Sequence, residues 1–89
     1  MNTLSERLIH IQYFALLREE RGVGEETFKT AAATAGELYE ELRGKYHFRL
    51  PAERLRVSVN DQFCDWQTEL KSGDCVVFIP PVAGGSILS

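Results

Sequence analysis

Apolar and polar side chains alternate near the start of the chain, and the pattern then changes to a helical spacing. The alternation has the period of a half-buried strand, with Ile9, Ile11 and Tyr13 on one face. From Phe14 onward a run of helix-forming residues continues until Gly22. We therefore predict a strand followed directly by a short helical turn.

A second strand and one long helix come next. Residues 25–31 contain threonine and phenylalanine, which favour strands, and are predicted to form a hairpin with the first strand. Thr34 and Glu37 form a capping box, in which each side chain can satisfy a backbone amide at the start of a helix. The apolar stripe of this helix consists of Ala35, Leu38, Tyr39, Leu42 and Tyr46. Its acidic residues should face water, with Glu41 placed to pair with Lys45.

Two further strands are predicted after Pro51, which interrupts the helical pattern. Apolar residues alternate with polar ones in the first of them, at Leu55, Val57 and Val59. Asn60 and Asp61 are typical turn residues, and Phe63 lies in the short strand that follows.

The chain then crosses over and ends in a very apolar strand. Residues 66–70 form the crossing segment, with Leu70 pointing inward, and Gly73 suits a turn that needs a positive φ. The last strand ends at Ile79. Its pairing should stop at Pro80, because proline donates no backbone hydrogen bond and holds φ near about −65°.

The order strand, strand, helix, strand, short strand, strand predicts an α+β domain. One main helix would cover one face of a mixed sheet of about five strands, with the first and last strands in the centre. This is the ubiquitin-like β-grasp arrangement. We assign residues 1–79 to this domain, with residues 1–7 disordered, and residues 80–89 to an extended C-terminal tail.

Composition and charge narrow the range of partners. A chain of 89 residues has room for one core, and its net charge of −3 with scattered Lys and Arg argues against nucleic acid as a partner. No apolar run approaches the ~18 residues that span a membrane, and the first residues lack the features of a signal peptide. We expect a cytoplasmic protein that does not engage a membrane.

The residues that most often carry chemistry give little indication of an active site. Cys64 and Cys75 lack the spacing of a redox pair and no His or Cys cluster suits a metal, so we expect two reduced thiols with ordinary packing roles. His10 lies on the polar face of the first strand, where a solvated histidine is more frequent than a catalytic one.

The C-terminal tail is the most unusual segment. Pro80 and Pro81 stiffen its start, and Gly84 and Gly85 remove side chains near its end. Residues 80–85 could extend about 20 Å at ~3.3 Å per residue, enough to enter the pocket of a partner. A narrow channel could admit such a tip, and a carbonyl there would be unhindered.

Several segments of the chain together match a known family. They are Ile9–Glu19, Val57–Asn60, Leu70–Asp74 and Ile79–Gly85. The most specific feature is a Gly-Asp pair, an apolar strand, Pro-Pro and Gly-Gly in series. By these residues the chain resembles the small subunits of molybdopterin synthase, which are sulfur carriers of molybdenum-cofactor biosynthesis.

The resemblance implies a carrier that is not catalytic alone and binds no cofactor. A separate adenylating enzyme would activate the carboxylate of Gly85 with ATP, and a thiocarboxylate would form there, with Gly84 giving steric clearance. The tail would then enter a large subunit and pass its sulfur to a cyclic pyranopterin precursor. The resemblance also implies an assembly of two small and two large subunits.

The resemblance further implies an apolar docking surface near the tail. By motif position its side chains would be Phe14, Phe63 and Ile79, with a polar contact from Arg18. The tail residues in contact with the partner would be Pro80, Pro81, Val82 and Ala83. The alternative is that all three apolar side chains belong to a small core.

The chain departs from the family pattern by continuing past the second glycine. Because Ser86–Ser89 follow it, Gly85 is an internal amide and cannot be adenylated as written. Three explanations are open: a protease removes the four residues, they are an artificial addition, or this copy is inactive.

Two other functions remain open at the level of sequence. The chain could carry sulfur for another pathway, such as thiamine synthesis, transfer-RNA thiolation or a specialised metabolite. It could instead be a ubiquitin-like modifier or an interaction module, with Gly85 forming isopeptide bonds or having no chemical role.

Overall fold

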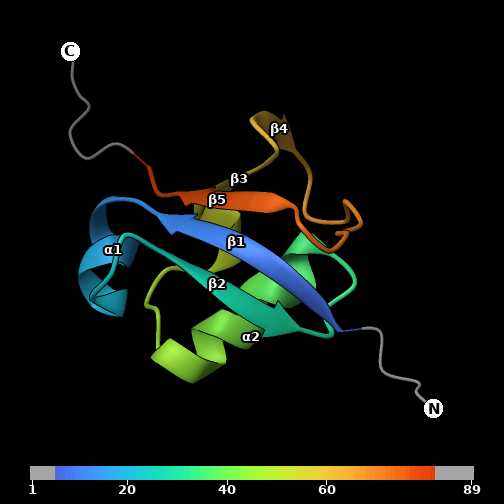
Figure 1. Ribbon diagram of the computed structural model, residues 1–89. Coiled ribbons are helices and arrows are strands. Elements are labelled where there is room, and N and C mark those ends of the chain that lie inside the picture. The colour runs from blue at the N-terminus through green and yellow to red at the C-terminus, as the bar shows by residue number, and fades with distance from the viewer. Residues whose placement is uncertain (1–5, 82–89) are drawn as a thin grey trace.

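A five-stranded sheet lies against one long helix in the computed structural model, which describes residues 6–81 (Figure 1). The strands are β1 (Arg7–Tyr13), β2 (Glu25–Thr30), β3 (Arg56–Val59), β4 (Gln62–Cys64) and β5 (Cys75–Ile79). The helical elements are α1 (Ala15–Arg21), α2 (Ala35–Tyr46) and the 3-10 turn η1 (Ala52–Arg54). The elements follow the predicted order.

The sheet has the mixed topology of a β-grasp fold. Its strand order is β2-β1-β5-β3-β4, so β1 and β5 are interior strands, as predicted. They pair in parallel, whereas the other three pairings are antiparallel. The ends of β1 and β5 therefore meet at one end of the sheet, where α1 also lies (Figure 1).

The alternation in β1 predicts its buried face correctly. Ile9, Ile11 and Tyr13 are almost completely buried, on the side of the sheet that faces α2. The helix contributes the buried residues Ala35, Leu38, Tyr39 and Leu42 to the same core. Fully burying a side chain of this size stabilises the fold by about 1.5–3 kcal/mol, so this face is the main source of stability.

The predicted cap of α2 is present in a shifted form. Thr34 Oγ1 accepts a hydrogen bond of 3.2 Å from the Glu37 amide, while the Glu37 carboxylate accepts one of 2.8 Å from the amide of Ala33. A capping box predicts that this carboxylate bonds to the amide of Thr34, but it bonds to the preceding amide, that of Ala33, instead. The first amides of the helix are all satisfied, because those of Ala35 and Gly36 donate to the carbonyls of Thr68 and Trp66.

The expected pair between Glu41 and Lys45 is replaced by contacts with β2. Glu41 accepts a hydrogen bond from the Thr30 hydroxyl, and the Lys45 ammonium lies 5.2 Å from the centre of the Phe28 ring. Spacing along one helix could not reveal these contacts, because their partners lie on another element.

The turns near the later strands have the conformations that the sequence predicts. Asn60 and Asp61 both have positive φ, 53° and 71°, as a tight two-residue hairpin turn requires. Gly73 has a φ of 93°, and Leu70 is buried. The sheet pairing of β5 ends before Pro80, as predicted.

The start of the ordered domain differs from the expectation. Arg7, placed by sequence in a disordered segment, belongs to β1 and pairs with Thr30. Its guanidinium donates hydrogen bonds to the carbonyls of Leu70 and Ala32. A polar residue thus joins the sheet because its side chain bonds to two neighbouring segments.

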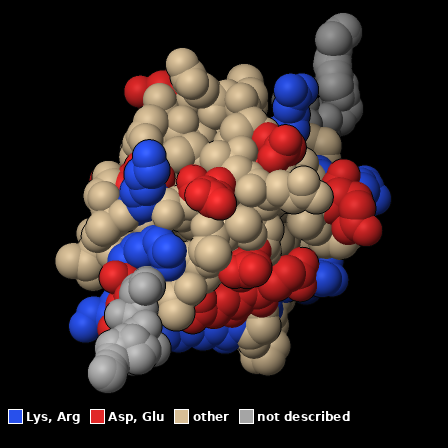
Figure 2. Space-filling model, turned by 90° about the vertical axis from the view of Figure 1, so that its right-hand side faces the viewer, with Lys and Arg blue, Asp and Glu red and all other residues tan. Residues whose placement is uncertain are grey.

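The described residues set some limits on partners. Within residues 6–81, no helix is long and apolar enough to cross a membrane. On the face shown in Figure 2, Lys and Arg are scattered among Asp and Glu, so that face offers no continuous basic surface to a phosphate backbone.

Candidate functional site

An apolar groove lies where the C-terminal tail leaves the sheet. It is lined by Phe14, Ala15, Leu16, Leu50, Ile79, Pro80 and Pro81, none of which carries a charge or a polar side chain. The tail therefore begins in the wall of the groove. Any partner bound there would also be next to the tail.

The parallel pairing of β1 and β5 brings two groove residues together. Tyr13 is the register partner of Phe78, and both side chains are buried towards α2. The next residues, Phe14 and Ile79, consequently lie side by side and point outward. Phe14 is 46% exposed, so it is not part of the core.

The backbone of Ala15 turns the chain sharply into α1. Its φ of 53° lies in the left-handed region, which disfavours any residue with a Cβ. Leu17 is buried under the short helix, while Leu16 is exposed and lines the groove. The tight turn thus places two successive apolar side chains, Phe14 and Leu16, on the groove.

A hydrogen bond from α2 fixes the far wall of the groove. The hydroxyl of Tyr39 donates a bond of 2.6 Å to the carbonyl of Leu50. Burial raises the pKa of Tyr39 to about 12, so this hydroxyl keeps its proton at neutral pH and remains a donor.

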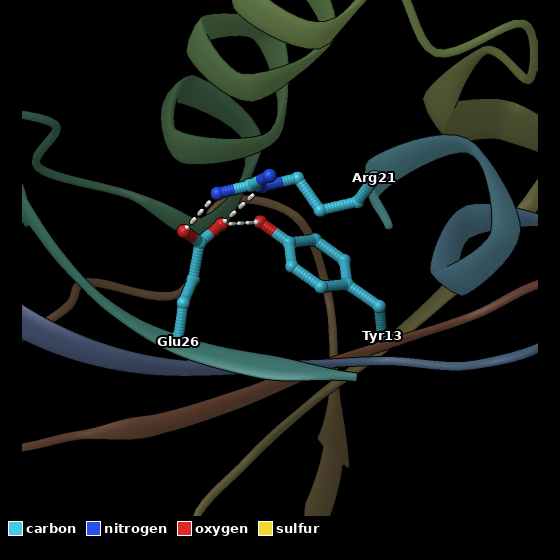
Figure 3. Close-up of polar contacts among 3 residues, drawn as sticks. All are labelled: Tyr13, Arg21 and Glu26. Carbon is cyan, nitrogen blue, oxygen red and sulfur yellow. Dashed lines mark hydrogen bonds and ion pairs between the residues drawn. The ribbon is translucent and has the colours of Figure 1, made fainter. Parts of the chain in front are cut away.

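A polar cluster ties α1 to the sheet, as Figure 3 shows. Glu26 of β2 accepts a bond of 2.6 Å from the Tyr13 hydroxyl and two bonds from the Arg21 guanidinium, of 2.7 and 3.0 Å. The guanidinium carbon also lies 4.1 Å from the centre of the Tyr46 ring. We call Tyr13, Arg21 and Glu26 the α1 clamp.

The charges of the α1 clamp support one another. The hydrogen bond from Arg21 is the main reason that the pKa of Glu26 is lowered, although burial opposes the effect. Burial, followed by the bond to Glu26, raises the pKa of Tyr13 well above its usual range. Tyr13 therefore stays a neutral donor and Glu26 a charged acceptor.

Sequence reasoning missed the α1 clamp, although one signal was available. Glu26 is the register partner of Ile11, so its side chain is on the inward face of β2. A carboxylate at an inward position needs a buried partner. The pattern did not identify that partner, because Arg21 comes from a different element.

Phe63 lies apart from the groove. It is 62% exposed on β4, paired with Ser58 on the same outward face of the sheet, and the Arg56 guanidinium carbon lies 4.7 Å from the centre of its ring. Arg56 is in turn the register partner of Ile79. The structure therefore brings Phe14 and Ile79 together and places Phe63 further along the same face, beyond Arg56.

Arg18 lies at the other side of Phe14. Arg18 and Phe14 share a shallow depression with Gln12, Gly24 and Glu25. A Cβ built on Gly24 would come within 3.3 Å of Arg18 Nε, so the arginine rests close to this glycine. A polar side chain is thus available next to the apolar groove.

The remaining predicted site residues divide into two groups. Pro80 is buried and Pro81 is exposed, and both line the groove. Val82, Ala83, Gly84 and Gly85 lie outside the described residues.

The cysteines and acidic residues form no second site in the described part of the chain. Cys64 and Cys75 are both unpaired, and burial, followed by Asp61 and Glu25, raises the pKa of the Cys75 thiol. Among residues 6–81, no group of three or more His, Cys, Asp and Glu is placed to hold a metal ion.

Comparison with known proteins assigns most of the chain to one group of relatives. Residues 11–85 match the model of the ThiS family. A molybdopterin synthase sulfur carrier subunit of Haemophilus influenzae is 32% identical over 82 residues, covering 88% of this chain and 100% of the relative. One from Mycobacterium tuberculosis is 34% identical over 80 residues, covering 86% and 96%.

A solved complex contains a chain with a similar fold. It is the complex of subunits 1 and 2 of the molybdopterin-converting factor of Helicobacter pylori. The matching chain is 28% identical, with a TM-score of 0.60, and the match covers 88% of this chain and 99% of that one.

Proposed function

This chain belongs to the ThiS family, and on that basis we propose that it is the sulfur-carrier small subunit of a molybdopterin synthase. The two curated relatives with that name match it over almost their whole length. The solved complex of subunits 1 and 2 supports a large subunit as the partner.

The observation that carries this proposal is the continuity between the apolar groove and the tail. Pro80 and Pro81 line the groove and also begin the tail. A large subunit that buries Phe14 and Ile79 would therefore receive the tail in a fixed direction. Gly85 is the fourth residue after Pro81, so the tip can extend about 13 Å beyond the groove at ~3.3 Å per residue.

The chemistry explains why the tip has no side chains. An adenylating enzyme would join the Gly85 carboxylate to AMP from ATP, with release of pyrophosphate. Sulfur at the oxidation level of sulfide would then attack the acyl carbon and displace AMP, which leaves a thiocarboxylate on Gly85. Glycine at both positions leaves the acyl carbon open to attack, and the two prolines reduce the entropy lost when the tail enters a partner.

Within the large subunit, the thiocarboxylate sulfur would form a bond to carbon of a cyclic pyranopterin precursor. Hydrolysis of the acyl–sulfur bond would then restore the Gly85 carboxylate. The small subunit contributes the reacting group and the docking surface, while catalysis belongs to the large subunit. Gly85 can take this role only after residues 86–89 are removed, because its carboxylate is otherwise part of a peptide bond. A protease is therefore part of the proposal.

Reconstitution tests the function as a whole. The chain ending at Gly85 is first thiolated, then mixed with the large subunit and the pyranopterin precursor, and molybdopterin formation is measured. We expect product from the thiolated chain, and none from the same chain before thiolation. Thiolation without transfer to this precursor would contradict the molybdopterin assignment, and adducts on lysines of other proteins would favour a modifier.

A further inference from the structure

We propose that this chain associates with a second copy of itself through the outer edge of β2, in an antiparallel pairing with a two-fold axis at Thr27. The two sheets would then form one continuous sheet. This dimer is a state of the protein beyond the proposed carrier function, because it involves neither the apolar groove nor the tail.

The backbone of β2 presents unpaired groups at one edge of the sheet (Figure 1). The Tyr13 amide donates a 2.8 Å bond to the Gly24 carbonyl, so these two residues are a hydrogen-bonded pair of the antiparallel ladder. Bonded and non-bonded pairs alternate along such a ladder. The backbone groups of Glu25, Thr27 and Lys29 therefore point away from β1. All three residues are exposed.

The two edges of the sheet differ in their capacity to pair. β2 has six residues, whereas β4, at the other edge, has three. Unpaired amides and carbonyls of an edge strand are a template for another strand, and a very short edge strand is one way to prevent such pairing. The longer edge at β2 is thus the one suited to a second copy.

The side chains along this edge are complementary to themselves. Glu25 and Lys29 have opposite charges and lie two residues on either side of Thr27. An antiparallel partner centred on Thr27 sets Glu25 opposite Lys29 of the second copy, and this pair occurs twice. Thr27 faces Thr27 of the second copy. Opposite charges and threonine pairs both stabilise such cross-strand contacts. Each of these residue pairs also exchanges two backbone hydrogen bonds.

The charges favour one register of pairing. Lysine on an edge strand commonly prevents pairing, because it is left without a suitable partner. A shift by two residues in either direction would set Lys29 opposite Thr27 or Val23 and leave both charges unpaired. In the centred register every charge on this face of β2 meets its opposite. The edge charges therefore select a register for the second copy.

The surroundings of the edge are compatible with this register. His10 Nε2 lies 2.8 Å from Oε1 of Glu25, and in the described part of the chain no hydrogen bond or ion pair involves Oε2. On the inward face, Phe28 would lie opposite Glu26 of the second copy. The Lys45 ammonium is 5.2 Å from the centre of the Phe28 ring, so the carboxylate would meet a positive charge.

The dimer would leave both docking surfaces accessible. Gln12 is the register partner of Glu25, so this end of β2 lies at the same end of the sheet as the groove. Antiparallel pairing consequently places the two grooves at opposite ends of the dimer. No residue of β2 lines the groove. Because exposed ion pairs contribute little and the interface is small, we expect reversible association.

Charge exchange tests the pairing in sedimentation velocity of the full chain over a range of concentrations at low salt. The parent should form a dimer as the concentration rises. Lys29→Glu and Glu25→Lys each set like charges opposite one another at both pairs, so each should weaken the association about tenfold or more. An equimolar mixture of the two variants should recover it, because each charge then meets its opposite. The double variant Glu25→Lys with Lys29→Glu should recover it as well.

Arg54→Glu is the matched control. It changes the net charge by the same amount as Lys29→Glu, on an exposed residue of η1. We expect it to associate like the parent. A loss equal to that of Lys29→Glu would assign the effect to net charge and overturn the inference.

Nuclear magnetic resonance locates the interface. In the parent, the amide signals of Thr27 and Lys29 should shift with protein concentration, whereas those of β4 should not. Shifts at β4 in place of β2 would overturn the inference. So would a monomer even at millimolar protein, or single variants that associate like the parent, or a mixture that shows no recovery. These measurements need neither sulfur nor a large subunit, so the dimer and the carrier function can fail independently.

Discussion

The hydroxyl of Tyr13 donates a 2.6 Å hydrogen bond to the carboxylate of Glu26. Tyr13 points inward to this bond, and the next residue, Phe14, points outward into the groove. Arg21 completes the α1 clamp from the other end of α1. The α1 clamp and the groove thus use neighbouring residues of the chain whose side chains point to opposite sides of the sheet.

Replacing Glu26 by glutamine should destabilise the fold. Glu26→Gln removes a charged acceptor whose side chain is 16% exposed and leaves Arg21 with a weaker partner. Hydrogen bonds to charged groups contribute about 1.5–3 kcal/mol, so we expect a loss of this order in the free energy of unfolding. Urea denaturation measures it. Glu19→Gln, on the exposed side of α1, is the matched control and should change stability little.

The same variant should alter the dependence of stability on pH. The pKa of Glu26 is lower in the folded protein than in the unfolded chain, so its contribution is complete above the unfolded value of about 4.3. That contribution is lost as the pH falls through the lower folded value. The free energy of unfolding should therefore decrease less steeply on acidification in Glu26→Gln than in the parent. If the free energy of unfolding fell equally steeply on acidification in the two proteins, the charged form of Glu26 would not be stabilised by the α1 clamp.

The left-handed backbone at Ala15 predicts an unusual response to substitution. Ala15→Gly removes the clash of Cβ and should leave stability unchanged or raise it by up to about 1 kcal/mol, although glycine is normally unfavourable in a helix. Ala15→Val should destabilise the fold by more than about 1 kcal/mol, because a β-branched residue tolerates this φ poorly. Thermal unfolding of both variants checks the order. The conformation would be refuted if glycine were the more damaging substitution.

A second left-handed residue ends α2 and is far from the groove. His47 has a φ of 61°, and its amide donates a 2.8 Å bond to the Arg43 carbonyl. Glycine is preferred at this position after a helix, so His47→Gly should raise the free energy of unfolding by about 1 kcal/mol. His47→Ala keeps the unfavourable Cβ and should give no such gain. A stabilisation of equal size in both variants would assign the effect to loss of the imidazole.

The docking surface predicts a separation between stability and binding. Phe14 and Phe63 are well exposed, so replacing either by alanine should change the free energy of unfolding by less than about 1 kcal/mol. Each change should weaken binding to the large subunit by about tenfold or more, as expected for buried aromatic contacts. Isothermal titration calorimetry measures the binding. Leu8→Ala is the matched control, since Leu8 is equally exposed but far from the groove.

The affinities of Phe14→Ala and Phe63→Ala for the large subunit together define the extent of the interface. Loss of affinity in Phe14→Ala alone would limit the interface to the groove. An unchanged affinity in Phe14→Ala would remove the groove from the interface and contradict the proposed docking.

The sequence predicts the fold well because each element depends on a local pattern. Alternation at Ile9, Ile11 and Tyr13 identifies β1, and the Asn60–Asp61 turn identifies the β3–β4 hairpin. The groove is only partly predictable. Phe14 and Ile79 follow from their position and from family resemblance, but Leu16 and Leu50 join them only through the turn at Ala15 and the path before η1.

The contacts that sequence reasoning missed all join side chains on one element to another element or loop. Arg7 bonds to Leu70, a separation of 63 residues, and Glu41 bonds to Thr30 across the gap between helix and sheet. Long polar side chains have many geometrically possible partners, and the hydrophobic pattern does not select among them. The α1 clamp belongs to the same group.

Intact mass spectrometry of the chain ending at Gly85 tests the central claim most directly. The protein is incubated with the adenylating enzyme, ATP and a sulfur donor, with the full-length chain as the control. We predict that the shortened chain gains the mass that replaces one oxygen by sulfur, only when ATP is present, and that the full-length chain does not change. A shortened chain whose mass stays the same under these conditions would contradict the assignment of Gly85 as a sulfur carrier.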